Sequence, residues 1–105
     1  MEVLAIHDSK DLIEITYNYE KDGVFLRREL DKKILSNTGI WADIAFLYQD
    51  LNLATADWKS PKITIARFKK VDGVWTKQSH FHINGQKRAD QIIATLSVWR
   101  ERLEA

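Results

Sequence analysis

The 105-residue chain contains no cysteine, one proline and four glycines, and none of its apolar runs is long. The absence of cysteine excludes disulfide scaffolds, thiolate catalysis and cysteine-ligated zinc sites. The scarcity of proline and glycine excludes collagen-like and low-complexity chains. A membrane-spanning helix needs about 20 consecutive apolar residues, so the sequence predicts no membrane span.

The start of the chain also lacks the positive charges and the apolar stretch of a secretory signal, so we expect a cytoplasmic protein. Hydrophobic residues make up 45% of the chain and charged residues 30%, which is an ordinary globular mixture. Its length suits one domain, and we treat residues 1–105 as a single unit.

Alternating apolar residues and turn signals predict strands over most of the chain. Two Asp-Gly pairs, at positions 22–23 and 72–73, each mark the turn of a hairpin. The predicted strands are residues 12–19, 23–30, 40–49, 62–70 and 74–83, with a further short strand in residues 1–7. Residues 31–39 and 50–60 are expected to be loops.

The strand over 40–49 has a competing interpretation, and the strand over 74–83 has two distinct faces. Ile40, Ile44 and Leu47 also fit a helical stripe, so a helix over 40–49 is the alternative there. In the last strand, strict alternation places Trp75, Phe81 and Ile83 on one face, and His80 and His82 on the other. Trp75 is expected to belong to the core, because it shares a face with Phe81 and Ile83.

The period changes after Asn84, which is expected to be the N-cap of a helix over residues 86–103. Its apolar residues recur at helical spacing: Ala89, Ile92, Ile93, Leu96, Trp99 and Leu103. The face of Ile92, Leu96, Trp99 and Leu103 is expected to be buried. The sequence therefore predicts an α+β fold, a curved antiparallel meander of about five strands followed by one C-terminal amphipathic helix. Open sheet edges favour a homodimer. Val98 lies off the main apolar stripe of the helix, so it either extends the dimer contact or is a single exposed residue.

The 16 basic and 15 acidic residues nearly balance, but they are unevenly distributed. Residues 58–88 contain eight basic residues and one acidic residue, Asp72, whereas the remaining segments are net acidic. A basic segment of this kind is typical of a surface for a polyanion, although a solvated face balanced by acidic neighbours is equally compatible.

Aromatic and cationic residues are interleaved in this segment, as in proteins that bind single-stranded nucleic acid without sequence preference. In that interpretation the cations contact phosphates and the aromatic rings stack on bases. The candidate phosphate contacts are Lys62, Arg67, Lys69, Lys70 and Lys77, and the candidate stacking residues are Trp58 and Phe68. Alternatively, these aromatic rings belong to the core, and the chain is a protein-interaction or dimerisation module whose basic face meets an acidic partner protein.

No nucleophile motif and no glycine-rich phosphate loop is present, so we expect neither an enzyme nor a cofactor. His80 and His82 have a spacing that can hold a metal ion. A third ligand would come from His7, Glu29 or Asp43, but a two-residue motif is weak evidence, so we predict no metal site.

Residues 40–103 resemble the single-stranded DNA-binding domain of the positive-cofactor type of transcriptional coactivator and, more loosely, the Whirly family. The resemblance lies in the strand over 40–49, the hairpin around Asp72-Gly73 and the helix after the sequence Phe81-His82-Ile83-Asn84. It implies a dimer that holds single-stranded DNA across curved sheets, and a role in transcription or DNA maintenance.

Overall fold

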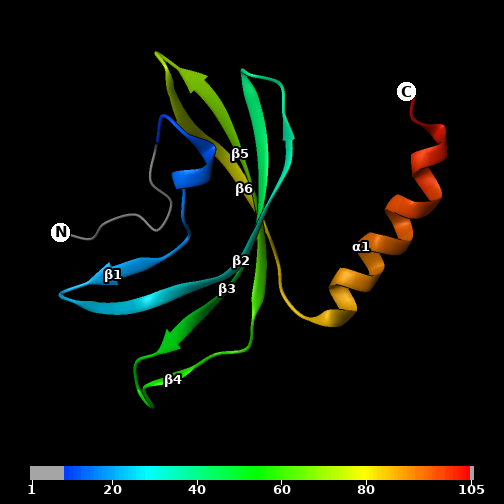
Figure 1. Ribbon diagram of the computed structural model, residues 1–105. Coiled ribbons are helices and arrows are strands. Elements are labelled where there is room, and N and C mark those ends of the chain that lie inside the picture. The colour runs from blue at the N-terminus through cyan, green and yellow to red at the C-terminus, as the bar shows by residue number, and fades with distance from the viewer. Residues whose placement is uncertain (1–8, 105) are drawn as a thin grey trace.

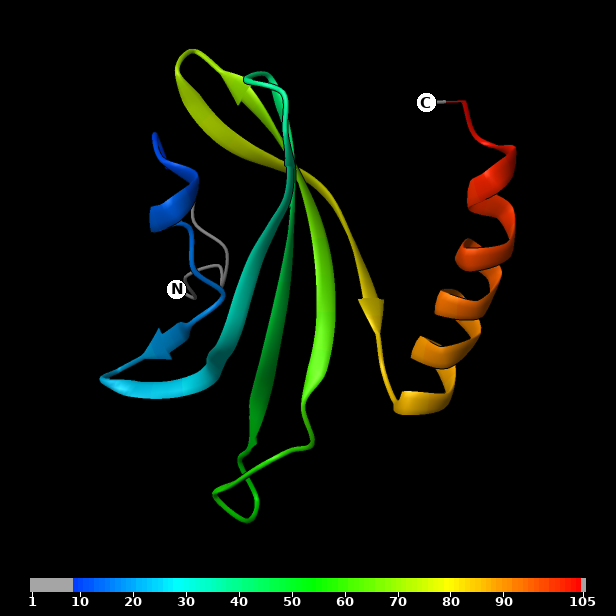
Figure 2. The same ribbon diagram turned by 45° about the vertical axis from the view of Figure 1, so that its right-hand side comes forward.

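The computed structural model describes residues 9–104 and shows a curled antiparallel sheet with one C-terminal helix (Figure 1), which confirms the predicted α+β fold. Residues 9–18, which we call the N-terminal segment, and the helix lie on opposite sides of the sheet (Figure 2). In chain order the elements are η1 (Leu12–Glu14), β1 (Tyr19–Lys21), β2 (Val24–Asn37), β3 (Trp41–Asn52), β4 (Asp57–Trp58), β5 (Lys62–Val71), β6 (Val74–Ile83), α1 (Gln86–Trp99) and η2 (Arg100–Arg102).

The strands pair in the order β1-β2-β3-β5-β6, and the two-residue β4 pairs with the end of β3. The side chains of β3 alternate between two environments. We call the side that carries buried Ala42, Ile44, Phe46 and Tyr48 the covered face. The opposite side, on which Trp41 lies, is the open face. The alternation of β3 and the strand registers therefore decide which side each residue of β5 and β6 occupies.

The N-terminal segment covers part of the covered face and completes the core with Leu12, Ile15 and Tyr17. The Lys32 ammonium on β2 holds it there, since its Nζ donates to the backbone carbonyls of Leu12 at 2.5 Å, Ile13 at 3.0 Å and Ile15 at 2.6 Å.

The predicted strand over 12–19 is therefore wrong for most of its length. Asp11 caps a single turn of 3₁₀ helix, and only Tyr19 at the end of the predicted range begins β1. A lysine side chain, instead of a neighbouring strand, satisfies the carbonyl groups of this segment. The strand predicted in residues 1–7 lies outside the described residues.

The strand predicted over 40–49 is confirmed as β3, and the competing helix is not observed. The loop predicted over 31–39 is wrong for most of its length, because β2 continues to Asn37. Irregularities in the register with β3 fall between Glu29 and Asp31 and between Ile34 and Ser36. These bulges let one long strand bend with the curled sheet, although its sequence looks polar and loop-like.

A bulge also changes the predicted faces of β6. Arg67 pairs with Ser79, but the next residue of β5, Phe68, pairs with Lys77, so Gln78 is the extra residue. Trp75 therefore shares the covered face with His80 and His82 and is only 4% exposed. The predicted burial of Trp75 is confirmed, but its predicted place beside Phe81 and Ile83 is wrong.

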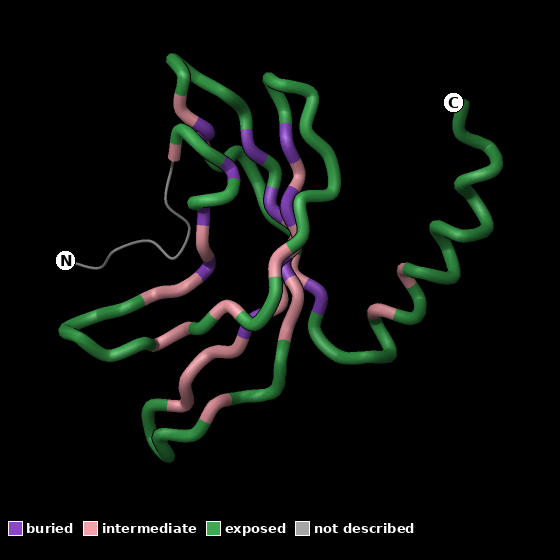
Figure 3. The backbone as a smooth tube through the Cα atoms, in the orientation of Figure 1, coloured by how far each residue is buried: buried purple, intermediate pink, exposed green. Residues whose placement is uncertain are grey.

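The predicted helix is present as α1 and η2, yet its predicted burial is wrong. No residue of α1 is buried, and Trp99 and Leu103 are 56% and 75% exposed (Figure 3). The N-cap is Gly85, at a φ of 84°, and no side chain caps the helix, so the prediction for Asn84 is also wrong. No helix within residues 9–104 has the length and apolar character needed to cross a membrane.

We predict that Lys32→Ala destabilises the fold by about 1.5–3 kcal/mol, the range for hydrogen bonds that involve a charged group. Urea unfolding at neutral pH measures this loss. Lys33→Ala is the matched control, because the neighbouring Lys33 lies on the open face and is exposed. Equal losses in the two variants would contradict the role given to Lys32.

Candidate nucleic-acid interface

The cations predicted to contact phosphates do not form one surface. The register with β3 places Arg67 opposite Asp43 and Lys69 opposite Trp41, both on the open face. Lys62 is opposite Tyr48, Lys77 is opposite Phe68 and Lys70 is opposite Trp75, all on the covered face. The basic segment therefore divides between the two sides of the sheet, because neighbouring residues of a strand point in opposite directions.

The two predicted stacking residues have different positions. Phe68 is fully buried between β3 and β6, so the prediction that it stacks on a base is wrong. Trp58 on β4 is half-buried, and the guanidinium of Arg28 lies 4.3 Å from its ring centroid. Arg28 is thus a cation–π partner of Trp58 that lies outside the basic segment of the sequence.

Trp41 is the exposed aromatic residue that sequence reasoning missed. Its side chain is 38% exposed at the start of β3. The Arg67 guanidinium lies 5.5 Å from its ring centroid and the Lys69 ammonium lies 5.3 Å from it. The tight turn before β3 fixes its backbone, since Thr38 Oγ1 accepts from the Trp41 N–H at 3.0 Å. A signal was present in the sequence, because aromatic residues are favoured in strands and Trp41 is the second residue of the strand predicted over 40–49.

Asp43 partly neutralises this Trp41 cluster, which we define as Trp41, Arg67 and Lys69. Arg67 Nε donates to Asp43 Oδ1 at 3.1 Å, and Ser36 Oγ donates to Oδ2 of the same carboxylate at 3.1 Å. The hydrogen bond from Arg67 holds the pKa of Asp43 below its usual value, with a further contribution from Ser36. The pair is exposed to solvent, so Arg67 remains accessible to a competing anion.

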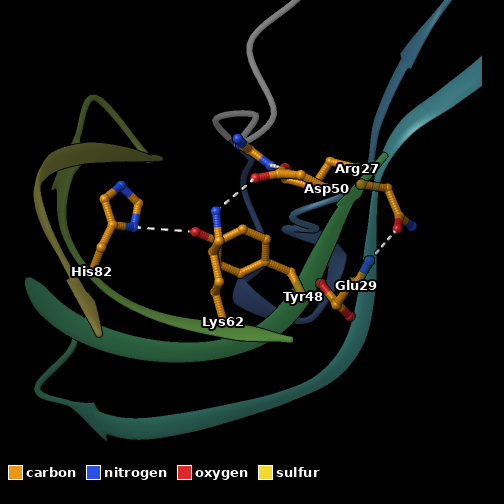
Figure 4. A network of polar contacts seen from close by, with 7 residues as sticks. Arg27, Glu29, Tyr48, Asp50, Lys62 and His82 are labelled. Carbon is orange, nitrogen blue, oxygen red and sulfur yellow. Dashed lines mark hydrogen bonds and ion pairs between the residues drawn. The ribbon is translucent and has the colours of Figure 1, made fainter. Parts of the chain in front are cut away.

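On the covered face, Lys62 belongs to a polar network around two tyrosines (Figure 4). Its Nζ lies 3.7 Å from Asp50 Oδ2, and Arg27 Nε donates to Asp50 Oδ1 at 2.8 Å. The Arg27 guanidinium also lies over the rings of Tyr17 and Tyr48, at 4.6 and 5.2 Å. Burial raises the pKa of Tyr48 to about 12, so its hydroxyl is protonated at neutral pH. The charge of Lys62 is therefore already engaged within the fold.

His80 and His82 lie side by side on the covered face, with ring centroids 4.5 Å apart. Tyr48 Oη is 3.4 Å from His82 Nδ1 (Figure 4), and Lys77 Nζ is 3.2 Å from His80 Nδ1. Asp43, one of the proposed third ligands, lies on the opposite face. The described part of the chain contains no cluster of three or more metal-ligating side chains, and His7 falls outside it.

Searches against protein-family models, curated proteins and solved structures find no match for this chain. The open face is therefore judged on its own chemistry. It brings Trp41, Arg67 and Lys69 together at one end of β3 and Trp58 with Arg28 at the other. At ~3.3 Å per residue these two ends lie ~33 Å apart, so they are separate places of contact.

We predict that Trp75→Ala costs about 3–5 kcal/mol of unfolding free energy, the usual range for a large aromatic side chain removed from a core. Trp41→Ala is the matched control and is expected to cost less than about 1 kcal/mol, since its ring packs mainly against surface cations. Thermal and urea unfolding measure both. A similar loss in the two variants would place Trp41 in the core.

We also predict that the fold becomes less stable as the pH falls from 7.5 to 5. Burial lowers the pKa of His82, with a smaller contribution from His80, so the unfolded chain binds the proton more readily. The loss begins near the unfolded value of about 6.5 and ends below the lowered folded value. Urea unfolding across this range measures it. His82→Gln is expected to flatten the dependence, and an unchanged pH profile in that variant would contradict the assignment.

Proposed function

We propose that this protein binds single-stranded nucleic acid through the open face, as a homodimer and without a catalytic step. The observation that carries the proposal is the Trp41 cluster, in which an exposed indole ring lies close to an arginine and a lysine of β5. Exposed rings stack on bases of any sequence, while adjacent cations contact the phosphates.

The charges of the open face support this role. The registers of β2 and β5 with β3 place cations on this side: Arg28, Lys33, Arg67 and Lys69. The carboxylates on the same part of the face are Asp31 and Asp43. The excess of positive charge attracts a polyanion, and the attraction weakens with salt because bound cations release counterions from the nucleic acid.

The setting of this activity follows the expectations from the sequence. A cytoplasmic accessory role in transcription or DNA maintenance is the role that the resemblance implies. The competing proposal is an acidic partner protein, which the division of cations between the two faces favours. An acidic protein needs the cations of the open face and does not need the stacking ring, so the two functions predict different effects of changing Trp41.

The test is the fluorescence anisotropy of a labelled oligothymidine over a salt series. We predict that Arg67→Ala with Lys69→Ala weakens binding and reduces the salt slope by roughly 1.4, at about 0.7 per lost phosphate contact on a single strand. Trp41→Ala is expected to weaken binding by about 1–3 kcal/mol with little change in slope, because stacking releases few counterions.

The matched control is Lys70→Ala with Lys77→Ala, which removes the same charge from the same hairpin but on the covered face. This variant is expected to keep the wild-type slope. Absence of wild-type binding at low salt, or equal effects of the two double variants, overturns the proposal. Sensitivity to Arg67 and Lys69 without sensitivity to Trp41 favours the acidic protein partner.

A further inference from the structure

Helix α1 stands away from the sheet and presents an apolar side that nothing in the described part of the chain covers. Ile93, Leu96 and Trp99 are 62%, 61% and 56% exposed. In Figures 1 and 2 the helix runs beside the sheet, and Figure 3 shows no buried position in it. Apolar residues in one stripe of a helix normally face a core.

Few local interactions hold α1 in place. It has 14 residues, which is near the length of about 12–15 at which an isolated helix is marginal in water. Gly85 supplies no side-chain cap, and no acidic residue lies in the first turn. One contact with the sheet is a cation–π pair at the beginning of the helix, where the Arg88 guanidinium lies 5.2 Å from the Phe81 ring. A stable α1 therefore needs packing from elsewhere.

The open face carries an apolar strip that the rest of the described chain covers only in part. We define the strip by its residues on β3, β5 and β6: Ala45, Leu47, Ile63, Ile65, Phe81 and Ile83. At one end of the strip Phe81 is 49% exposed and Ile83 is 8% exposed, and the four residues on β3 and β5 are half-buried. At the other end, Ala45, Leu47 and Ile63 line a groove of about 210 Å³ against β2.

A hollow of about 350 Å³ separates α1 from this strip, and Phe81, Ile92 and Leu96 are among the residues that line it. The helix therefore does not close over Phe81, the residue of the strip that lines this hollow. The Cα radius of gyration is 15.6 Å, whereas a compact chain of this length has one of ~13 Å. The excess is what a helix held away from its sheet produces.

We propose that a second copy of this chain fills the hollow, with α1 of each copy packed against the open-face strip and α1 of the other. The proposal specifies the surface of the homodimer put forward above and rests on it. A second copy is the favoured occupant because one chain supplies both apolar surfaces. In a two-fold dimer, α1 of each copy packs on the strip of the other copy, so both helices and both strips are covered. At ~21 Å, α1 is long enough to cross the ~14 Å between β2 and β6.

This arrangement leaves the Trp41 cluster free. Trp41 precedes the strip by four residues of β3, which is ~13 Å along the strand. Each dimer then carries two clusters, so an oligonucleotide long enough to reach both binds with avidity. Binding of a short oligonucleotide does not depend on the dimer.

The first test is the mass of the full chain in solution by light scattering, with twice 12.3 kDa as the expected result. Ile92→Glu with Leu96→Glu places two carboxylates in the hollow and is expected to give a monomer. Ala94→Glu with Val98→Glu is the matched control, because it places two carboxylates at the same spacing on the opposite side of α1 and is expected to remain dimeric. Circular dichroism reports whether the sheet stays folded in each variant.

The second test uses the absence of native cysteine. Phe81→Cys and Leu96→Cys are prepared in separate chains, mixed and oxidised, and a disulfide between the two chains is expected in high yield. A chain carrying both cysteines that closes on itself as a monomer overturns the proposal, since α1 then covers its own strip.

The outcomes separate this proposal from the function above. A monomeric wild type overturns the homodimer and its surface, while short-oligonucleotide binding judges the Trp41 cluster independently. A dimer that survives Ile92→Glu with Leu96→Glu overturns the surface alone, whatever the control variant does.

Discussion

A sheet with apolar side chains on both faces needs a cover on each of them, and the described part of this chain covers only one of them fully. The N-terminal segment completes the core on the covered face, where Phe46, Phe68 and Trp75 are buried. On the open face the apolar strip lies beside a hollow, with α1 beyond it. Because burial of apolar surface is the main favourable contribution to folding, this imbalance explains both the exposed helix and the case for a second copy.

On the covered face, the N-terminal segment is held in place by one lysine side chain. Lys32 bonds three backbone carbonyls of an irregular segment, and burial lowers its pKa. Glu29 supports the same segment by accepting from the Tyr17 N–H at 3.0 Å. A segment that cannot pair as a strand is thus held by side chains of β2, which lets its apolar residues reach the core without leaving buried carbonyl groups unpaired.

The candidate interface shows how pleating converts a linear charge pattern into two different surfaces. Lys69 and Lys70 are neighbours in the sequence, yet Lys69 lies 5.3 Å from Trp41 on the open face and Lys70 lies 5.6 Å from Trp75 on the covered face. Only the cations that share a face with an exposed ring combine the two contacts that single-stranded nucleic acid requires. The proposed function therefore depends on Trp41, which lies outside the basic segment of the sequence.

The sequence by itself determined most of the antiparallel strands, the two Asp-Gly turns and the final helix, because these follow from local periodicity and turn chemistry. The burial of Trp75 agrees with the sequence, although the alternation on which that expectation rests is broken by a bulge. It did not determine the bulge at Gln78, the continuation of β2 past Asp31 or the irregular segment held by Lys32. Each of these depends on a partner distant in the chain: a facing strand or a side-chain ammonium. Tertiary structure alone decided that Phe68 is buried, that Trp41 is open and that Trp99 lacks a cover, since exposure depends on what the rest of the chain places against each face.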